Sequence, residues 1–151
     1  YRVGWIAPGK FKDAIIRQKH IHLISTPTLN QEVVARFMEN DRYENHLRKL
    51  RHELHANSLH FAQSIIDYFP EDTKIITPQG GFMLWVELDK RIDTTTLYYK
   101  AMQQKISIAP GRMFTLQDQY KNCMRLSYGQ RWSPFIEERL MLLGNIIRKS
   151  F

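Results

Sequence analysis

The sequence predicts an α+β fold, in which a small, mostly antiparallel sheet with helices follows one long helix. Apolar residues recur at helical spacing from Arg42 to Phe69, with no glycine or proline between them. Beyond residue 70, short apolar runs bounded by turn residues alternate with helical patterns, as in small layered domains. The chain has no internal repeat and no low-complexity segment, which favours a globular arrangement.

Two helices and one strand are predicted before the long helix. Residues 2–7 resemble a short buried strand, a helical pattern runs from Phe11 to Leu23, and Thr28 is expected to cap a second helix ending near residues 40–41. A single strand cannot bury both of its faces alone. We therefore expect it to have neighbours in a larger domain.

The long helix is expected to end at Pro70, which cannot continue the hydrogen-bond ladder. Asn57 and Ser58 interrupt its apolar face, and the opposite face is basic. At about 1.5 Å per residue the helix would span about 40 Å, more than one small core needs. We therefore interpret it as a connection between two packed units.

The remaining elements are predicted from local patterns. Four short strands are expected at residues 74–77, 82–88, 106–109 and 124–128. The first two form a hairpin around the turn at 78–81, the second is expected to be covered on both faces, and a loop follows at 110–114. Asp93 is expected to cap a helix ending at Met102, and Ser133 with Pro134 to open the last helix.

Composition restricts the classes of function. The 151 residues are 43% hydrophobic with a formal net charge of +7, and the cations are spread, which favours a solvated basic face over a nucleic-acid site. No run approaches the roughly 18 apolar residues of a membrane span, and no secretory leader is recognised, so we expect a cytoplasmic protein without membrane contact. Cys123, the single cysteine, is expected to be buried, and no metal site is predicted.

Two arginines are the candidate functional residues. Arg2 and Arg125 are predicted in apolar strands, where a charge is costly without a partner anion. The guanidinium donates in a fixed fork that matches a carboxylate or a phosphate. Residue physics alone leaves an anion clamp and an internal salt bridge open for each. For Gly80 and Gly81, a tight turn and a close approach to a ligand both stay open.

Four spaced motifs resemble the C-terminal part of class I/II aminotransferases, which have the fold of pyridoxal-phosphate (PLP) fold-type I enzymes. The motifs are Arg2–Trp5, Gln79–Leu88, Ile108–Phe114 and Cys123–Ser127. The run His46–Arg51 is similar to a signature of the MocR subgroup of GntR-family transcription regulators. The chain therefore most resembles the aminotransferase-like domain of those regulators.

The resemblance implies roles for particular residues. Arg2 corresponds to the arginine that holds the PLP phosphate, and Arg125 to the one that binds the α-carboxylate of an amino-acid substrate or effector. Gly81 and Phe82 correspond to positions where the small domain closes over the ligand. Residues 1–41 would be the remnant of the large PLP-binding domain, and residues 42–151 the interdomain helix and the small C-terminal domain.

The resemblance also implies that the catalytic Schiff-base lysine precedes Tyr1. The lysines present lack the family's serine-containing setting, so we expect a fragment with no catalytic residue and no bound PLP of its own. The full-length protein would be a homodimer that binds PLP, an amino-acid effector, and DNA through a domain outside this chain. The alternatives are a genuine PLP-dependent aminotransferase, separated from a regulator by the sequence before Tyr1, and a free-standing nucleic-acid module supported by charge alone.

Overall fold

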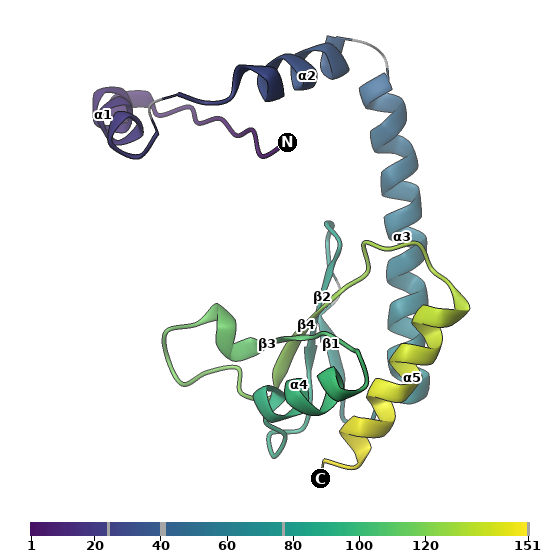
Figure 1. Cartoon of the computed structure of the whole chain (residues 1–151). Coiled ribbons are helices and arrows are strands. Elements are labelled where there is room, and N and C mark those ends of the chain that lie inside the picture. Colours follow the sequence, from purple (N-terminus) through teal and green to yellow (C-terminus); the bar gives the residue numbers. More distant parts are fainter. Residues whose placement is uncertain (24, 40–41, 77, 151) are drawn as a thin grey trace. The chain divides into compact units, whose positions relative to one another are not determined.

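The structure is a computed structural model that describes residues 1–23, 25–39, 42–76 and 78–150 (Figure 1). It divides into two compact units, Tyr1–Lys49 and Leu50–Phe151. The boundary between them lies within α3 (Arg42–Tyr68). The predicted assignment of these parts to a large and a small domain stays a prediction.

The first unit is helical. It contains the 3₁₀ helix η1 (Gly9–Phe11), α1 (Lys12–His22), α2 (Thr28–Glu39) and the first turns of α3. Thr28 is the first residue of α2, and the predicted end at residues 40–41 lies outside the described residues.

The strand predicted at residues 2–7 is wrong. These residues have no regular structure, and Trp5 is 91% exposed. A strand needs a partner for its backbone N–H and C=O groups, and no described segment pairs with this one. Arg2 therefore does not lie in a buried strand, and its side chain is exposed.

The predicted long helix is confirmed as α3, which ends one residue before Phe69. Phe61 and Ile65 on its apolar face are buried in the second unit, and the cations of the opposite face are exposed. Asn57, predicted to be a polar interruption, is also buried, at 6% exposure.

The second unit contains a four-stranded sheet in which every pairing is antiparallel. The strands are β1 (Lys74–Ile76), β2 (Met83–Glu87), β3 (Ala109–Pro110) and β4 (Cys123–Ser127), in the spatial order β1-β2-β4-β3. The predicted β1–β2 hairpin is confirmed, with Ile75 opposite Val86. Thr77, the predicted last residue of the first strand, lies outside the described residues.

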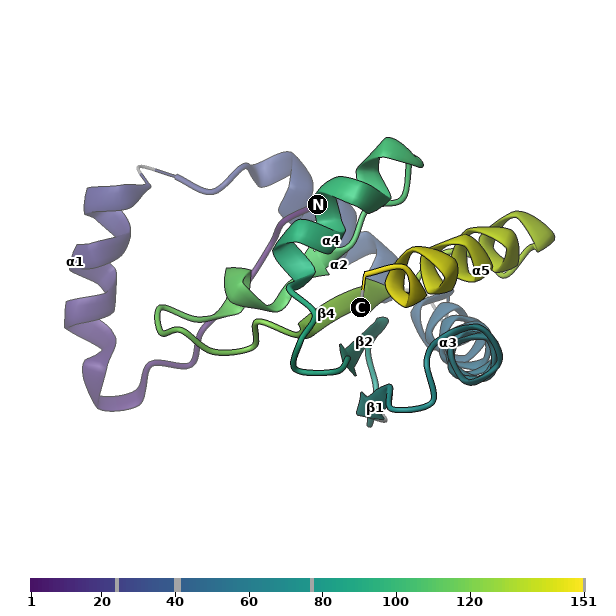
Figure 2. The same cartoon turned by 90° about the horizontal axis from the view of Figure 1, so that it is seen from below.

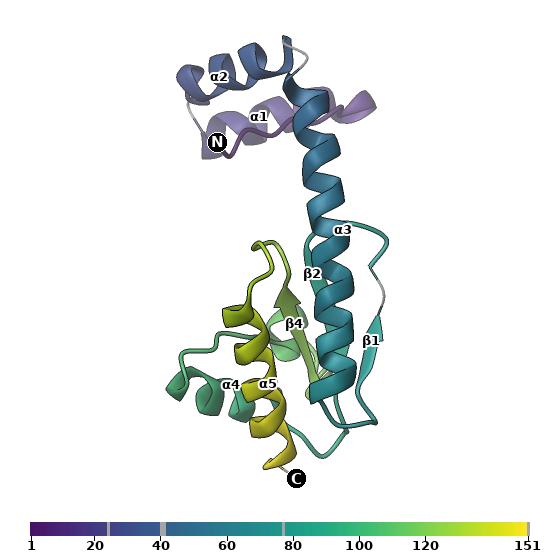
Figure 3. The ribbon, with the colours of Figure 1, turned by 90° about the vertical axis from the view of Figure 1, so that its right-hand side faces the viewer.

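Three helices cover one face of this sheet. The second half of α3, α4 (Thr94–Gln103) and α5 (Pro134–Arg148) lie on the same side of the strands (Figures 2 and 3). The predicted caps of α4 and α5 are confirmed, because Asp93 accepts a hydrogen bond from the Thr95 N–H and Ser133 accepts one from the Ile136 N–H. The core between sheet and helices contains Leu84, Val86, Met124, Leu126, Leu97, Leu143 and Ile147.

The other face of the sheet corrects two predictions. Residues of β2 alternate, with Leu84 and Val86 buried and Met83, Trp85 and Glu87 only half-buried, so β2 is not covered on both faces. The apolar run of β2 continues onto the uncovered face because Trp85 lies there. The predicted third strand is reduced to Ala109–Pro110, and the expected loop at 110–114 forms the 3₁₀ helix η2 (Gly111–Phe114).

Candidate functional site on the uncovered face of the sheet

Arg125 lies in the middle of the sheet, on the face that the helices do not cover. In β4 its Cα is opposite Trp85 of β2 on one side and opposite Ala109 of β3 on the other. Side chains of β4 alternate between the two faces, because Leu126 is buried whereas Arg125 is half-buried. Within the described chain no carboxylate lies within ion-pair distance of its guanidinium. Among the described residues, Arg125 therefore forms no internal salt bridge.

An aromatic cluster supports this arginine. The guanidinium carbon of Arg125 lies 4.4 Å from the ring centre of Phe114. The Trp85 ring makes edge-to-face contacts with Phe114 at 5.7 Å and with Tyr120 at 5.4 Å. The sequence reasoning missed Trp85 and Tyr120 as part of a site. The signal for Trp85 in the sequence was a large aromatic residue within the β2 segment.

The segment after β3 is folded so that it delivers Phe114 and Tyr120 to this face. A Cβ atom on Gly111 would lie 2.4 Å from the Tyr120 carbonyl oxygen, so only glycine fits there. Tyr120 itself has a φ of 57°, in the left-handed region. An Arg112–Asp118 ion pair of 3.0 Å closes the same segment. This close approach explains why the Ile108–Phe114 motif has glycine at position 111.

The arrangement is suited to holding a carboxylate. The contact with Phe114 limits the movement of the guanidinium, and no described carboxylate pairs with its N–H groups, so they are available to a ligand. A guanidinium in this state gains most from a bidentate anion, because less side-chain freedom is lost on binding.

Gly81 and Phe82 form the turn that enters β2, in the same unit as Arg125. Gly81 has a φ of 83°, which a tight turn requires, and a Cβ there would meet no atom within 4 Å. The Tyr128 N–H donates to the Phe82 carbonyl at 2.9 Å, and the Tyr128 hydroxyl donates to the Gly81 carbonyl at 3.1 Å. Burial raises the pKa of Tyr128, so this hydroxyl keeps its proton. The turn is therefore tied to the end of β4.

Asn57 is a second residue whose importance the sequence reasoning missed. Its side-chain amide donates to the carbonyls of Tyr128 (3.1 Å) and Gln130 (2.8 Å) and accepts from the Trp132 N–H (3.2 Å). It thereby holds the chain that leaves β4 against α3. A lone polar residue inside an apolar helical stripe was the signal available in the sequence.

Arg2 belongs to the first unit and Arg125 to the second. Its backbone has a φ of 53°, its side chain is exposed, and no ion pair joins it to a described carboxylate. The neighbouring Tyr1 carbonyl accepts a hydrogen bond of 2.9 Å from Asn30.

Cys123 is buried, as predicted. Cys123 is 5% exposed, and burial raises the pKa of its thiol, with Glu87 adding to the effect. A protonated buried thiol is a poor nucleophile. Across residues 1–23, 25–39, 42–76 and 78–150 no three metal-binding side chains come together, and no helix there is long and apolar enough to cross a bilayer.

The fold and this site define a class of protein. A sequence model of the family Aminotransferase class I and II matches residues 1–131, and the chain belongs to that family. The fold agrees with the crystal structure of the α-aminoadipate aminotransferase LysN from Thermus thermophilus. The TM-score is 0.84 over 95% of this chain and 36% of that chain, at 22% identity.

Among individual relatives, transcription regulators stand out. The uncharacterized HTH-type transcriptional regulators YjiR and YdcR of Escherichia coli K12 are each 31% identical to this chain over 99% of its length. The chain spans about a third of these relatives, 32% of each. The resemblance to an aminotransferase domain of the kind found in such regulators is thereby confirmed.

Proposed function

We propose that this chain is the C-terminal part of the aminotransferase-like domain of a MocR-type, GntR-family transcription regulator, and that it senses an amino acid or a related carboxylate. Its similarity to two HTH-type regulators over nearly its whole length supports this proposal. In the full-length protein, DNA would be bound by a domain outside this chain, in a cytoplasmic homodimer.

The observation that carries the proposal is the state of Arg125. This guanidinium is half-buried, its central carbon lies 4.4 Å from the Phe114 ring centre, and it has no carboxylate partner among the described residues. Leaving such a group half-desolvated is costly unless an anion binds it during function. The α-carboxylate of an amino acid would supply two oxygens in the geometry of the fork. Gly81 and Phe82, at the turn tied to Tyr128, would close over that ligand.

PLP is the cofactor that the family implies, and the residues present fit a part of its site. Arg2 is an exposed arginine without an ion pair among the described carboxylates, which suits a phosphate contact. When bound, PLP supplies an electrophilic carbonyl and an electron sink for an amino group. This chain would contribute the phosphate contact through Arg2 and the orientation of the amino acid through Arg125.

The alternative is a genuine PLP-dependent aminotransferase, and the fold match to LysN favours it. Arg125 would then anchor the carboxylates of an amino acid and a 2-oxo acid in turn. Both proposals use the same arginine. They differ in whether the full-length protein transfers an amino group and whether its DNA affinity responds to the ligand.

The test uses the full-length protein that contains this chain. Proteinogenic amino acids are screened by the change they cause in the PLP absorbance spectrum, and the affinity of the strongest is measured with and without Arg125→Lys. We expect the lysine to weaken that affinity by about tenfold or more, because a point charge replaces a bidentate fork. PLP affinity should stay nearly unchanged.

Arg131→Lys is the matched control, because Arg131 is exposed and outside the cluster. A ligand-dependent change in DNA affinity supports the regulator, whereas multiple turnovers with a 2-oxo acid and no DNA response support the enzyme. An equal loss of PLP and amino-acid affinity in Arg125→Lys would remove the role assigned to this residue.

A further inference from the structure

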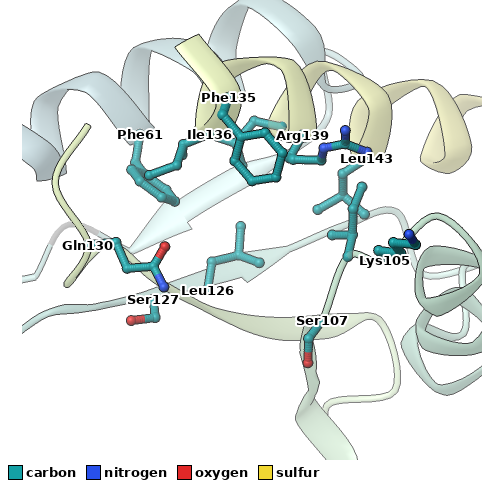
Figure 4. A pocket seen from close by; sticks show the side chains of 12 residues that line it. Phe61, Lys105, Ser107, Leu126, Ser127, Gln130, Phe135, Ile136, Arg139 and Leu143 are labelled. Atoms are coloured by element: carbon teal, nitrogen blue, oxygen red, sulfur yellow. The ribbon is translucent and has the colours of Figure 1, made fainter. Parts of the chain in front are cut away.

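A pocket lies on the helix-covered side of the sheet, away from Arg125. It has a volume of about 330 Å³ and lies between α5, the end of β4 and the segment that follows α4 (Figure 4). Its apolar lining comes from Phe61, Leu126, Phe135, Ile136, Leu140 and Leu143. Since Leu126 and Arg125 are neighbours in β4 and point to opposite faces, this pocket is distinct from the site described above.

The charged residues that line this pocket are both cations. Lys105 and Arg139 line it, and the lining contains no aspartate or glutamate. The two cations lie at the same end of the pocket, with Gln130 and Ser127 toward the other end (Figure 4). An apolar cavity with convergent cationic groups at one end is typical of sites for amphipathic anions.

Arg139 is incompletely paired. Its Nε atom is buried and has no hydrogen-bond partner, and its nearest carboxylate is Glu138, the preceding residue, at 3.7 Å. The guanidinium carbon lies 4.8 Å from the ring centre of Phe135, a side chain that is itself 63% exposed. Buried donors normally have an acceptor, so the Arg139 Nε–H is available to an acceptor atom of a ligand in the pocket.

Lys105 is held in a conformation that lysine rarely adopts. Its φ is 59°, and the hydrogen bonds Ile106 N–H to Ala101 O (3.0 Å) and Lys105 N–H to Met102 O (2.9 Å) form a Schellman motif at the end of α4. Glycine is the usual residue at this position because it has no steric cost there. A lysine kept in a strained conformation at the edge of a pocket points to a use for its ammonium group.

We propose that this pocket binds a monocarboxylate whose apolar body is a short alkyl chain, as a second ligand site of the protein. The apolar body would occupy the space between Phe61, Leu126 and Leu143, and the carboxylate would accept hydrogen bonds from Arg139 and Lys105. Charge and cavity together set the ligand class, since a neutral acceptor forms no ion pair with Arg139 and Lys105 and a cation is repelled by both.

The test compares three probes of equal chain length and different charge on the full-length protein, by isothermal titration calorimetry at about pH 7. Octanoate should bind at least about tenfold more tightly than octanamide, because only the carboxylate forms ion pairs with Arg139 and Lys105. Octylammonium should bind more weakly still. Equal affinities of octanoate and octanamide, or no measurable octanoate binding, would overturn the proposal.

Variants locate the binding. Arg139→Gln should weaken octanoate about tenfold, whereas Arg148→Gln, an exposed arginine at the end of the same helix, should leave it within about twofold. Lys105→Gly should weaken octanoate binding without lowering the midpoint of thermal unfolding, because glycine relieves the strain of the left-handed backbone.

Arg125→Lys should not change the affinity for octanoate. Loss in Arg125→Lys with none in Arg139→Gln would instead place the carboxylate at Arg125 and refute the second site.

Discussion

Gly144 shows how a single missing Cβ sets the distance between two helices. A Cβ at this position of α5 would lie 2.2 Å from the Tyr68 carbonyl oxygen at the end of α3. Alanine is the better helix former by about 1 kcal/mol, but overpacking against backbone costs about 1–3 kcal/mol or more. We expect Gly144→Ala to lower the free energy of unfolding, measured by urea denaturation.

Gly80→Ala is the control for that variant, because a Cβ at Gly80 meets no atom within 4 Å. Its unfolding free energy should stay within about 0.5 kcal/mol of the parent value, as for most surface changes. A stabilised Gly144→Ala protein would mean that α5 and α3 are further apart than described.

The buried side-chain amide of Asn57 forms hydrogen bonds with backbone groups that are distant in sequence. Asn57→Ala removes hydrogen bonds to three groups, in Tyr128, Gln130 and Trp132, and leaves them unpaired in a partly buried place. We expect a loss of about 2–4 kcal/mol in unfolding free energy by urea denaturation, given about 1 kcal/mol per bond plus desolvation. Asn145→Ala on the exposed side of α5 should have little effect. Equal effects of the two variants would show that the Asn57 bonds contribute nothing.

At the scale of elements, helices were predictable from sequence because their signals are local. The apolar spacing of α3, the Asp93 cap of α4 and the Ser133–Pro134 start of α5 each lie within a few residues of what they determine. Strands depend on partners elsewhere in the chain. The run at 2–7 has strand composition but finds no neighbour among the described residues, and it stays irregular.

The candidate site divides in the same way. Arg125 was predictable, because a charge between Met124 and Leu126 in a strand pattern stands out. Its aromatic support was not, since Trp85, Phe114 and Tyr120 come from separate segments that meet only through sheet pairing and the close approach at Gly111. The left-handed conformation of Lys105 has no sequence signal at all, because that position normally carries glycine.

At the scale of the whole chain, the two units differ in how they are stabilised. No described residue of Tyr1–Lys49 is buried, whereas every member of the hydrophobic core lies between Phe61 and Ile147. α1 has 11 residues and α2 has 12, and isolated helices shorter than about 12–15 residues are marginal in water. Nearly all of the stability should therefore belong to the second unit.

This difference is measurable by hydrogen exchange of the chain alone. Amides of α1 and α2 should exchange with local opening free energies below about 2 kcal/mol, while those of β2 and β4 should exchange only with global unfolding. Trypsin should correspondingly cut within residues 1–49 long before residues 50–151. In the full-length protein the same helices should become protected, because the rest of the proposed large domain would cover them. Equal protection of α1, α2 and β4 in the chain alone would show that the first unit has a core of its own. The proposal that the second unit supplies nearly all of the stability would then be wrong.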